Sequence, residues 1–163
     1  MTAERIVLCA VWIIVIVSLA VFVPRQKRRE AVIIHFADQL FTWSLSLLLA
    51  ELGWNENPVR EFVKAGSTNF TFNYALYPSM CVFYCLNYPQ HRPWPIRLLY
   101  SALYAGAYTL FGVLVARYTD LIHPLHWKWQ MNFVLGLTVF YMIYRYYRWY
   151  FRLASRGQAG GEL

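Results

Sequence analysis

The fold is decided by the stretch from Ile6 to Val23, IVLCAVWIIVIVSLAVFV, and by PRQKRR at residues 24–29, which follows it. The first stretch carries no charge, and a helix of its length can cross the hydrocarbon core of a bilayer. A cleaved signal peptide is the alternative interpretation, because Ser18-Leu19-Ala20 resembles a cleavage site. The basic run follows the apolar stretch instead of preceding it, however, and charge in that place resists translocation. We therefore expect a retained first helix with its amino end outside.

Four more apolar segments follow, at about residues 31–50, 70–86, 96–116 and 129–147. The chain is 59% hydrophobic and 14% charged, whereas a typical soluble domain has roughly 25% charged residues. The sequence thus predicts an all-α integral membrane bundle of five transmembrane helices. We expect one transmembrane domain over residues 1–156, since the length leaves no room for a separate soluble domain, and a disordered tail over 157–163.

Prolines refine this layout at two places. In the second loop, Asn57 can cap and Pro58 can begin a short interfacial helix, which Gly66 ends. In the third span, Pro78 is expected to kink the helix and to leave a carbonyl group for a neighbouring side chain to satisfy.

Lysine and arginine residues alternate between the two ends of the predicted helices. Ten of the 15 fall in the first loop, the third loop and the carboxyl-terminal region, and the other five fall on the opposite side. The positive-inside rule then predicts a multi-pass protein of the cell membrane, with the N-terminus outside and the C-terminus in the cytoplasm. Attraction to anionic lipids on the cytoplasmic side explains the net charge of +7, so nucleic acid is not expected as a partner.

Polar side chains share one face of the second span: His35, Asp38, Gln39, Thr42 and Ser46. Asp38 lies roughly 10 Å along the helix from its predicted start, where an unpaired carboxylate costs about 3 kcal/mol. This face must therefore point into the bundle or into a water-filled cavity. Two interpretations fit: a proton relay or polar substrate contact, in which His35 shares a proton or a charge with Asp38, and a buried structural pair that fixes helix packing.

The third and fourth spans carry matching faces of tyrosines and small residues. These faces comprise Asn73, Tyr77, Cys81, Tyr84 and Tyr88 on the third span, and Ser101, Tyr104, Ala105, Tyr108, Gly112 and Ala116 on the fourth. Interhelical packing is the usual role of such faces, but three of them can also enclose a cavity for an amphiphilic ligand. The predicted ligand or proton path consists of His35, Asp38, Gln39, Thr42, Asn73, Tyr77 and Tyr108.

The predicted outer loops hold a second group of candidates. Asp120, His123 and His126 are spaced three apart and are plausible ligand types for a transition metal if that stretch is helical, although Pro124 breaks a regular helix there. Solvated loop residues are the alternative. Arg60 with Glu61, and Arg117 with Asp120, are expected to form outer-loop ion pairs.

Cysteines give no sign of a disulfide framework or a zinc site. Cys9, Cys81 and Cys85 all lie in apolar segments and contain no Cys-x-x-Cys pair. We interpret them as small buried hydrophobic residues.

Several stretches together carry a family resemblance: NPVREFVKA at 57–65, NFTFNYALYP at 69–78, ARYTDLIH at 116–123 and WKW at 127–129. Over roughly residues 38–151 the chain resembles a family of small multi-pass membrane proteins of spore-forming Firmicutes. The resemblance implies residence in a bacterial membrane. It implies nothing about catalysis.

The sequence favours a non-enzymatic membrane component whose polar core binds or passes a small solute, ion or lipid. Five helices are few for a monomeric transporter, so a homo-oligomer is expected. An envelope or sporulation scaffold is the alternative, with the Pro-rich third loop and the basic tail as contact surfaces. An enzyme acting on a lipid or isoprenoid is less favoured, because Asp38 and the outer acidic residues are far apart along the membrane normal. The sequence identifies no cofactor.

Overall fold

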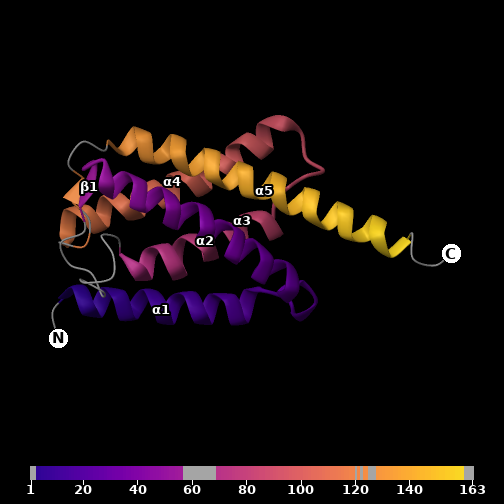
Figure 1. The fold of residues 1–163 in the computed structure, drawn as a ribbon, viewed down its shortest axis with the longest axis horizontal. Coiled ribbons are helices and arrows are strands. Elements are labelled where there is room, and N and C mark those ends of the chain that lie inside the picture. Colours follow the sequence, from indigo (N-terminus) through magenta and orange to yellow (C-terminus); the bar gives the residue numbers. More distant parts are fainter. Residues whose placement is uncertain (1–2, 57–68, 120, 122, 125–127, 160–163) are drawn as a thin grey trace.

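The computed structural model describes residues 3–56, 69–119, 121, 123–124 and 128–159. Its helices lie roughly along the long axis of the molecule (Figure 1). They are α1 (Ala3–Phe22), α2 (Arg28–Glu51), α3 (Tyr77–Leu86), α4 (Trp94–Tyr118) and α5 (Trp129–Ala159), with the 3-10 turn η1 (Arg25–Lys27) before α2 and the π-helical turn η2 (Phe72–Leu76) before α3. The described part of the chain is therefore helical, apart from one short pairing of two-residue strands.

Three described helical segments are long and apolar enough to cross a membrane: Arg5–Phe22, Arg25–Glu51 and Trp94–Tyr118. Large apolar side chains are exposed on their outer faces, among them Ile13, Phe36, Leu40, Leu103 and Leu110. Soluble proteins rarely leave such extended apolar surface in contact with water. These features indicate a membrane protein.

Helix α5 is longer than the sequence suggested. The predicted span ends at about Tyr147, but the helix continues to Ala159 and takes in residues 157–159 of the stretch assigned to a disordered tail. Residues 144–156 contain neither glycine nor proline, so no residue there interrupts the helical hydrogen bonds. The end of α5 extends past the other helices (Figure 1).

Two loops meet at one end of the bundle. Strand β1 (Asn55–Glu56) pairs antiparallel with β2 (His123–Pro124), with Asn55 opposite Pro124 and Glu56 opposite His123. The predicted metal site needed a helix to align Asp120, His123 and His126. The chain is extended at His123, and proline cannot continue a helix, so that helix is absent at His123. The expected interfacial helix near residues 58–66 lies outside the described residues.

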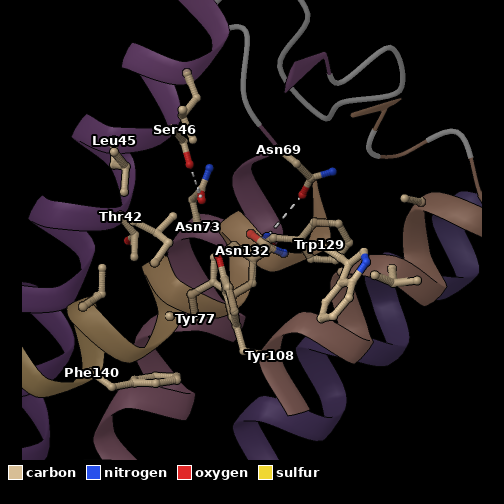
Figure 2. Close-up of a pocket in the computed structure, with 18 of the residues that line it drawn as sticks. Thr42, Leu45, Ser46, Asn69, Asn73, Tyr77, Tyr108, Trp129, Asn132 and Phe140 are labelled. Atoms are coloured by element: carbon tan, nitrogen blue, oxygen red, sulfur yellow. Dashed lines mark hydrogen bonds between the residues drawn. The ribbon is translucent and has the colours of Figure 1, made fainter. Parts of the chain in front are cut away.

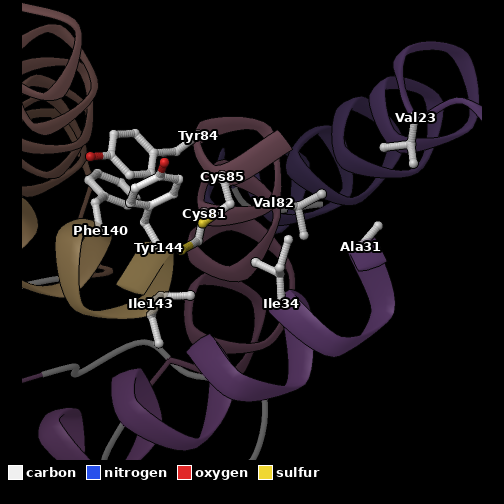
Figure 3. Packing of buried hydrophobic residues seen from close by; sticks show 10 residues of the cluster. All are labelled: Val23, Ala31, Ile34, Cys81, Val82, Tyr84, Cys85, Phe140, Ile143 and Tyr144. Atoms are coloured by element: carbon white, nitrogen blue, oxygen red, sulfur yellow. The ribbon is translucent and has the colours of Figure 1, made fainter. Parts of the chain in front are cut away.

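Aromatic side chains fill the opposite end, which carries the α1–α2 and α3–α4 connections. Tyr84 is 0% exposed, and its ring stacks on Tyr100 and Phe140 with centroid distances of 5.4 and 5.1 Å. Its hydroxyl group lies 2.8 Å from that of Ser101. Figure 3 shows Tyr84, Phe140 and Tyr144 packed together beside Cys81 and Cys85. This cluster closes the bundle at that end.

Glycines allow α4 and α5 to approach closely. A Cβ atom at Gly136 would lie 3.0 Å from the ring of Tyr108 and 3.7 Å from the Cα atom of Ala105. A Cβ atom at Gly112 would lie 3.0 Å from Nδ2 of Asn132. Such close approach through small residues is typical of membrane helices.

Candidate functional site

A cavity of about 560 Å³ lies between α2, the η2–α3 helix, α4 and α5. Figure 2 shows side chains from all of these elements around it, among them Thr42, Asn73, Tyr77, Tyr108, Asn132 and Phe140. Sites for small organic molecules have this size and this mixture of aromatic and polar groups.

Much of the cavity wall is formed by one half of α2, one half of α4 and one half of α5. It includes α2 from Asp38 to Leu49, α4 from Tyr108 to Arg117 and α5 from Trp129 to Phe140. These halves meet at the end of the bundle that carries β1, whereas Phe140 also belongs to the aromatic cluster around Tyr84. The cavity therefore lies toward the β1 end and is bounded on the other side by packed rings.

Asp38 lies in the wall near the closed end. Its side chain is 1% exposed, and neither carboxyl oxygen has a hydrogen-bond partner of good geometry among the residues that the structure describes. The thiol of Cys81 lies beside it, but a thiol is a weak donor. A buried carboxyl group without a strong partner is costly in a membrane protein, and such groups commonly mark functional sites.

Two nearby polar side chains of α2, Thr42 and Ser46, form hydrogen bonds that do not involve the carboxyl group of Asp38. Ser46 donates its hydroxyl proton to Oδ1 of Asn73, at 2.9 Å, as Figure 2 shows. Thr42 donates to the main-chain oxygen of Asp38, also at 2.9 Å, a bond typical of threonine inside a helix. The first bond joins α2 to η2 across the cavity wall.

Asn69 begins the third helical stretch. The helix starts at Phe70, and Oδ1 of Asn69 accepts a hydrogen bond of 3.2 Å from the main-chain N–H of Phe72, which caps the helix. Its Nδ2 has no partner among the described residues. Asn69 also belongs to the cavity wall.

His35 has a different partner from the one predicted. Pro78 has no N–H group, so the main-chain carbonyl of Tyr74 lacks its usual donor four residues later. The imidazole ring of His35 lies beside the main chain of Tyr74. His35 is absent from the cavity wall, and no hydrogen bond joins it to the carboxyl group of Asp38.

The other predicted path residues divide into two groups. Thr42, Asn73, Tyr77 and Tyr108 line the cavity together with Asp38. Gln39 does not; it is 7% exposed, and its Oε1 has no partner among the described residues. The structure therefore brings only some residues of the predicted path together around the cavity.

The contribution of α5 was missed at the sequence level. Asn132, Gly136 and Phe140 follow one another at intervals of four residues and share one face of α5, and all three line the cavity. An asparagine within an apolar span is the signal that could have identified this face.

The outer-loop candidates lie largely beyond the described residues. Arg60, Glu61, Asp120 and His126 are not described, and for His123 only the main chain is. No group of three His, Cys, Asp or Glu side chains in the described ranges is arranged to hold a metal ion. Arg117 lies at the end of α4 and, with Lys128, belongs to the cavity wall.

No known protein family, curated protein or solved structure matches this chain. The assignment of a function therefore depends on the site itself.

Proposed function

We propose that this protein is a non-enzymatic, multi-pass membrane protein that binds a small solute or lipid in the cavity between α2, η2–α3, α4 and α5. All five helices cross the membrane, with the N-terminus outside and the C-terminus in the cytoplasm. The cavity then faces the outside, and anionic lipids lie against the basic cytoplasmic end.

The cavity itself is the observation that carries this proposal. Its wall combines apolar side chains such as Leu45 and Val139 with the polar groups of Asn73 and Asn132, which suits an amphiphilic molecule. Phe140 belongs both to the cavity wall and to the cluster of packed rings with Tyr84 and Tyr144, which bounds the cavity at that end. This closure favours binding over passage through the bundle.

The wall also argues against acid–base catalysis. Asp38 is the one carboxyl group among the described residues that line the cavity. A mechanism with paired acids needs a second carboxyl group beside the same substrate. A binding role needs none.

Bound molecules can be identified directly. The full chain is purified in mild detergent, small molecules and lipids are extracted, and mass spectrometry compares wild type with Gly112→Leu, whose new side chain enters the cavity beside Asn132. Gly106→Leu is the matched control on the same helix, because a Cβ atom at Gly106 meets nothing within 4 Å. We expect a compound that is enriched with wild type and Gly106→Leu and at least about tenfold depleted with Gly112→Leu. The same extract from all three proteins would contradict the proposal.

Passage of ions is tested separately. In liposomes, proton and cation flux through wild type and Asp38→Asn is expected to stay at the level of empty liposomes, because packed rings close the cavity. Flux through wild type that Asp38→Asn abolishes would show that the core conducts.

A further inference from the structure

We propose that the ligand carries an ammonium group, and that this group binds the carboxylate of Asp38 at the closed end of the cavity. This inference rests on the proposed binding function and specifies the chemistry of the ligand.

The first support is the state of Asp38. Its side chain is buried at 1% exposure, belongs to the cavity wall and has no strong hydrogen-bond partner among the described residues. A buried carboxylate needs a compensating charge or several donors. No basic side chain in the described ranges supplies a hydrogen bond to it, and both carboxyl oxygens are covered by protein. A cationic ligand would therefore reach them by rotation of the Asp38 side chain toward the cavity.

The second support is the set of rings around that position. Tyr77 and Tyr108 have centroids 4.9 Å apart, and Phe140 lies 6.2 Å from Tyr108. All three line the cavity, and Tyr108 is close enough to Asp38 for an electrostatic interaction. Aromatic rings attract ammonium ions through their electron-rich faces. A carboxylate with neighbouring aromatic rings is therefore suited to an organic ammonium group.

The rest of the cavity defines the body of the ligand. Leu45, Leu49 and Leu135 provide apolar wall between the closed end and the mouth, which suits an alkyl or aryl chain. Arg117 and Lys128 also line the cavity, are both cationic and disfavour a second positive charge beside them. We therefore expect a monoamine whose distal end is neutral or anionic.

The test compares three probes of similar size: 2-phenylethylamine, 2-phenylethanol and 3-phenylpropanoate. Each is titrated at neutral pH into the full chain in lipid nanodiscs, and empty nanodiscs provide the blank for partition into lipid. Binding is followed calorimetrically. A charge-assisted hydrogen bond predicts that wild type binds the amine about ten- to a hundredfold more tightly than the alcohol, and that the carboxylate binds most weakly.

Two variants locate the effect. Asp38→Asn keeps the shape of the side chain and removes its charge, so the preference for the amine should disappear. Glu51→Gln makes the same chemical change on the same helix at an exposed position outside the cavity wall, so the preference should remain. The comparison of probes on wild type decides the question even if Asp38→Asn fails to fold.

The outcomes separate this inference from the proposed function. If amine and alcohol bind wild type equally and Gly112→Leu blocks both, the cavity binds ligands but the ammonium inference is wrong. An amine preference that persists in Asp38→Asn also overturns it. Absence of binding by every probe overturns the ammonium inference as well, whereas the extraction experiment with Gly112→Leu judges the binding function independently.

Discussion

At Pro78 the third helix lacks an N–H donor, and the imidazole ring of His35 lies beside the main chain of Tyr74 at that point. The π-helical turn η2 immediately precedes α3, and such turns often occur where a helix departs from regular hydrogen bonding. A single side chain of α2 thus supports an interruption in its neighbour. This contact suits a structural role for His35 in supporting the interrupted helix.

His35→Leu should lower the stability of the protein. The substitution removes the ring N–H groups beside the main chain of Tyr74, and a polar contact between membrane helices contributes about 1 kcal/mol. His35→Gln retains an N–H donor and should recover part of the loss. His91→Leu is the control, because His91 is exposed in the connection between α3 and α4. Thermal unfolding in detergent measures all three; equal midpoints for wild type and His35→Leu would show that the contact carries no stability.

At the scale of whole helices, the α4–α5 contact determines the shape of the cavity. Gly136 lies against the ring of Tyr108, and Gly112 lies against the amide of Asn132. Larger side chains at these positions would separate the two helices or fill the space between them. The glycines therefore set both the helix spacing and the volume available to a ligand.

Gly136→Leu should destabilise the bundle by about 1–3 kcal/mol, because its side chain overlaps the ring of Tyr108. Gly106→Leu, where the space is open, should leave the unfolding midpoint nearly unchanged. Thermal unfolding of the two variants side by side tests this expectation. If both variants shift the unfolding midpoint equally, Gly136 does not limit how closely α4 and α5 pack.

Helices were the most predictable feature of this chain, because long apolar runs such as Ile6–Val23 have few other stable arrangements in a bilayer. The polar face of α2 was predictable for the same reason, since Asp38 cannot face lipid at low cost. The partner of His35 was not, because it depends on how α2 crosses the interrupted third helix. The role of α5 was not predictable either, because aromatic residues occur on all sides of that helix and do not distinguish its inward face.

For the whole molecule, the proposed orientation in the membrane is the one that the distribution of Lys and Arg favours. In that orientation we expect Glu51 on the outside and Gln90 in the cytoplasm. Both residues are exposed, so each can carry a reporter group. The orientation decides from which side a ligand reaches Asp38.

Cysteine labelling tests this orientation. Cys9, Cys81 and Cys85 are replaced by alanine, and Glu51→Cys or Gln90→Cys is added singly. A membrane-impermeant maleimide applied to intact cells should label Glu51→Cys, and should label Gln90→Cys only after permeabilisation. The reverse pattern would place the cavity mouth in the cytoplasm.

The depth of Asp38 has an electrical consequence. Trp129 and Trp149 are both exposed, and the helix between them rises about 30 Å, which matches the hydrocarbon thickness. Phe140, at the closed end of the cavity, lies about halfway between them. In the proposed orientation, a cation that travels from the outside to Asp38 therefore crosses roughly half of the transmembrane potential, worth about 1.2 kcal/mol at 100 mV. An inside-negative voltage should tighten the binding of an ammonium ion about sevenfold, so a respiring cell would load this site more fully than a de-energised one.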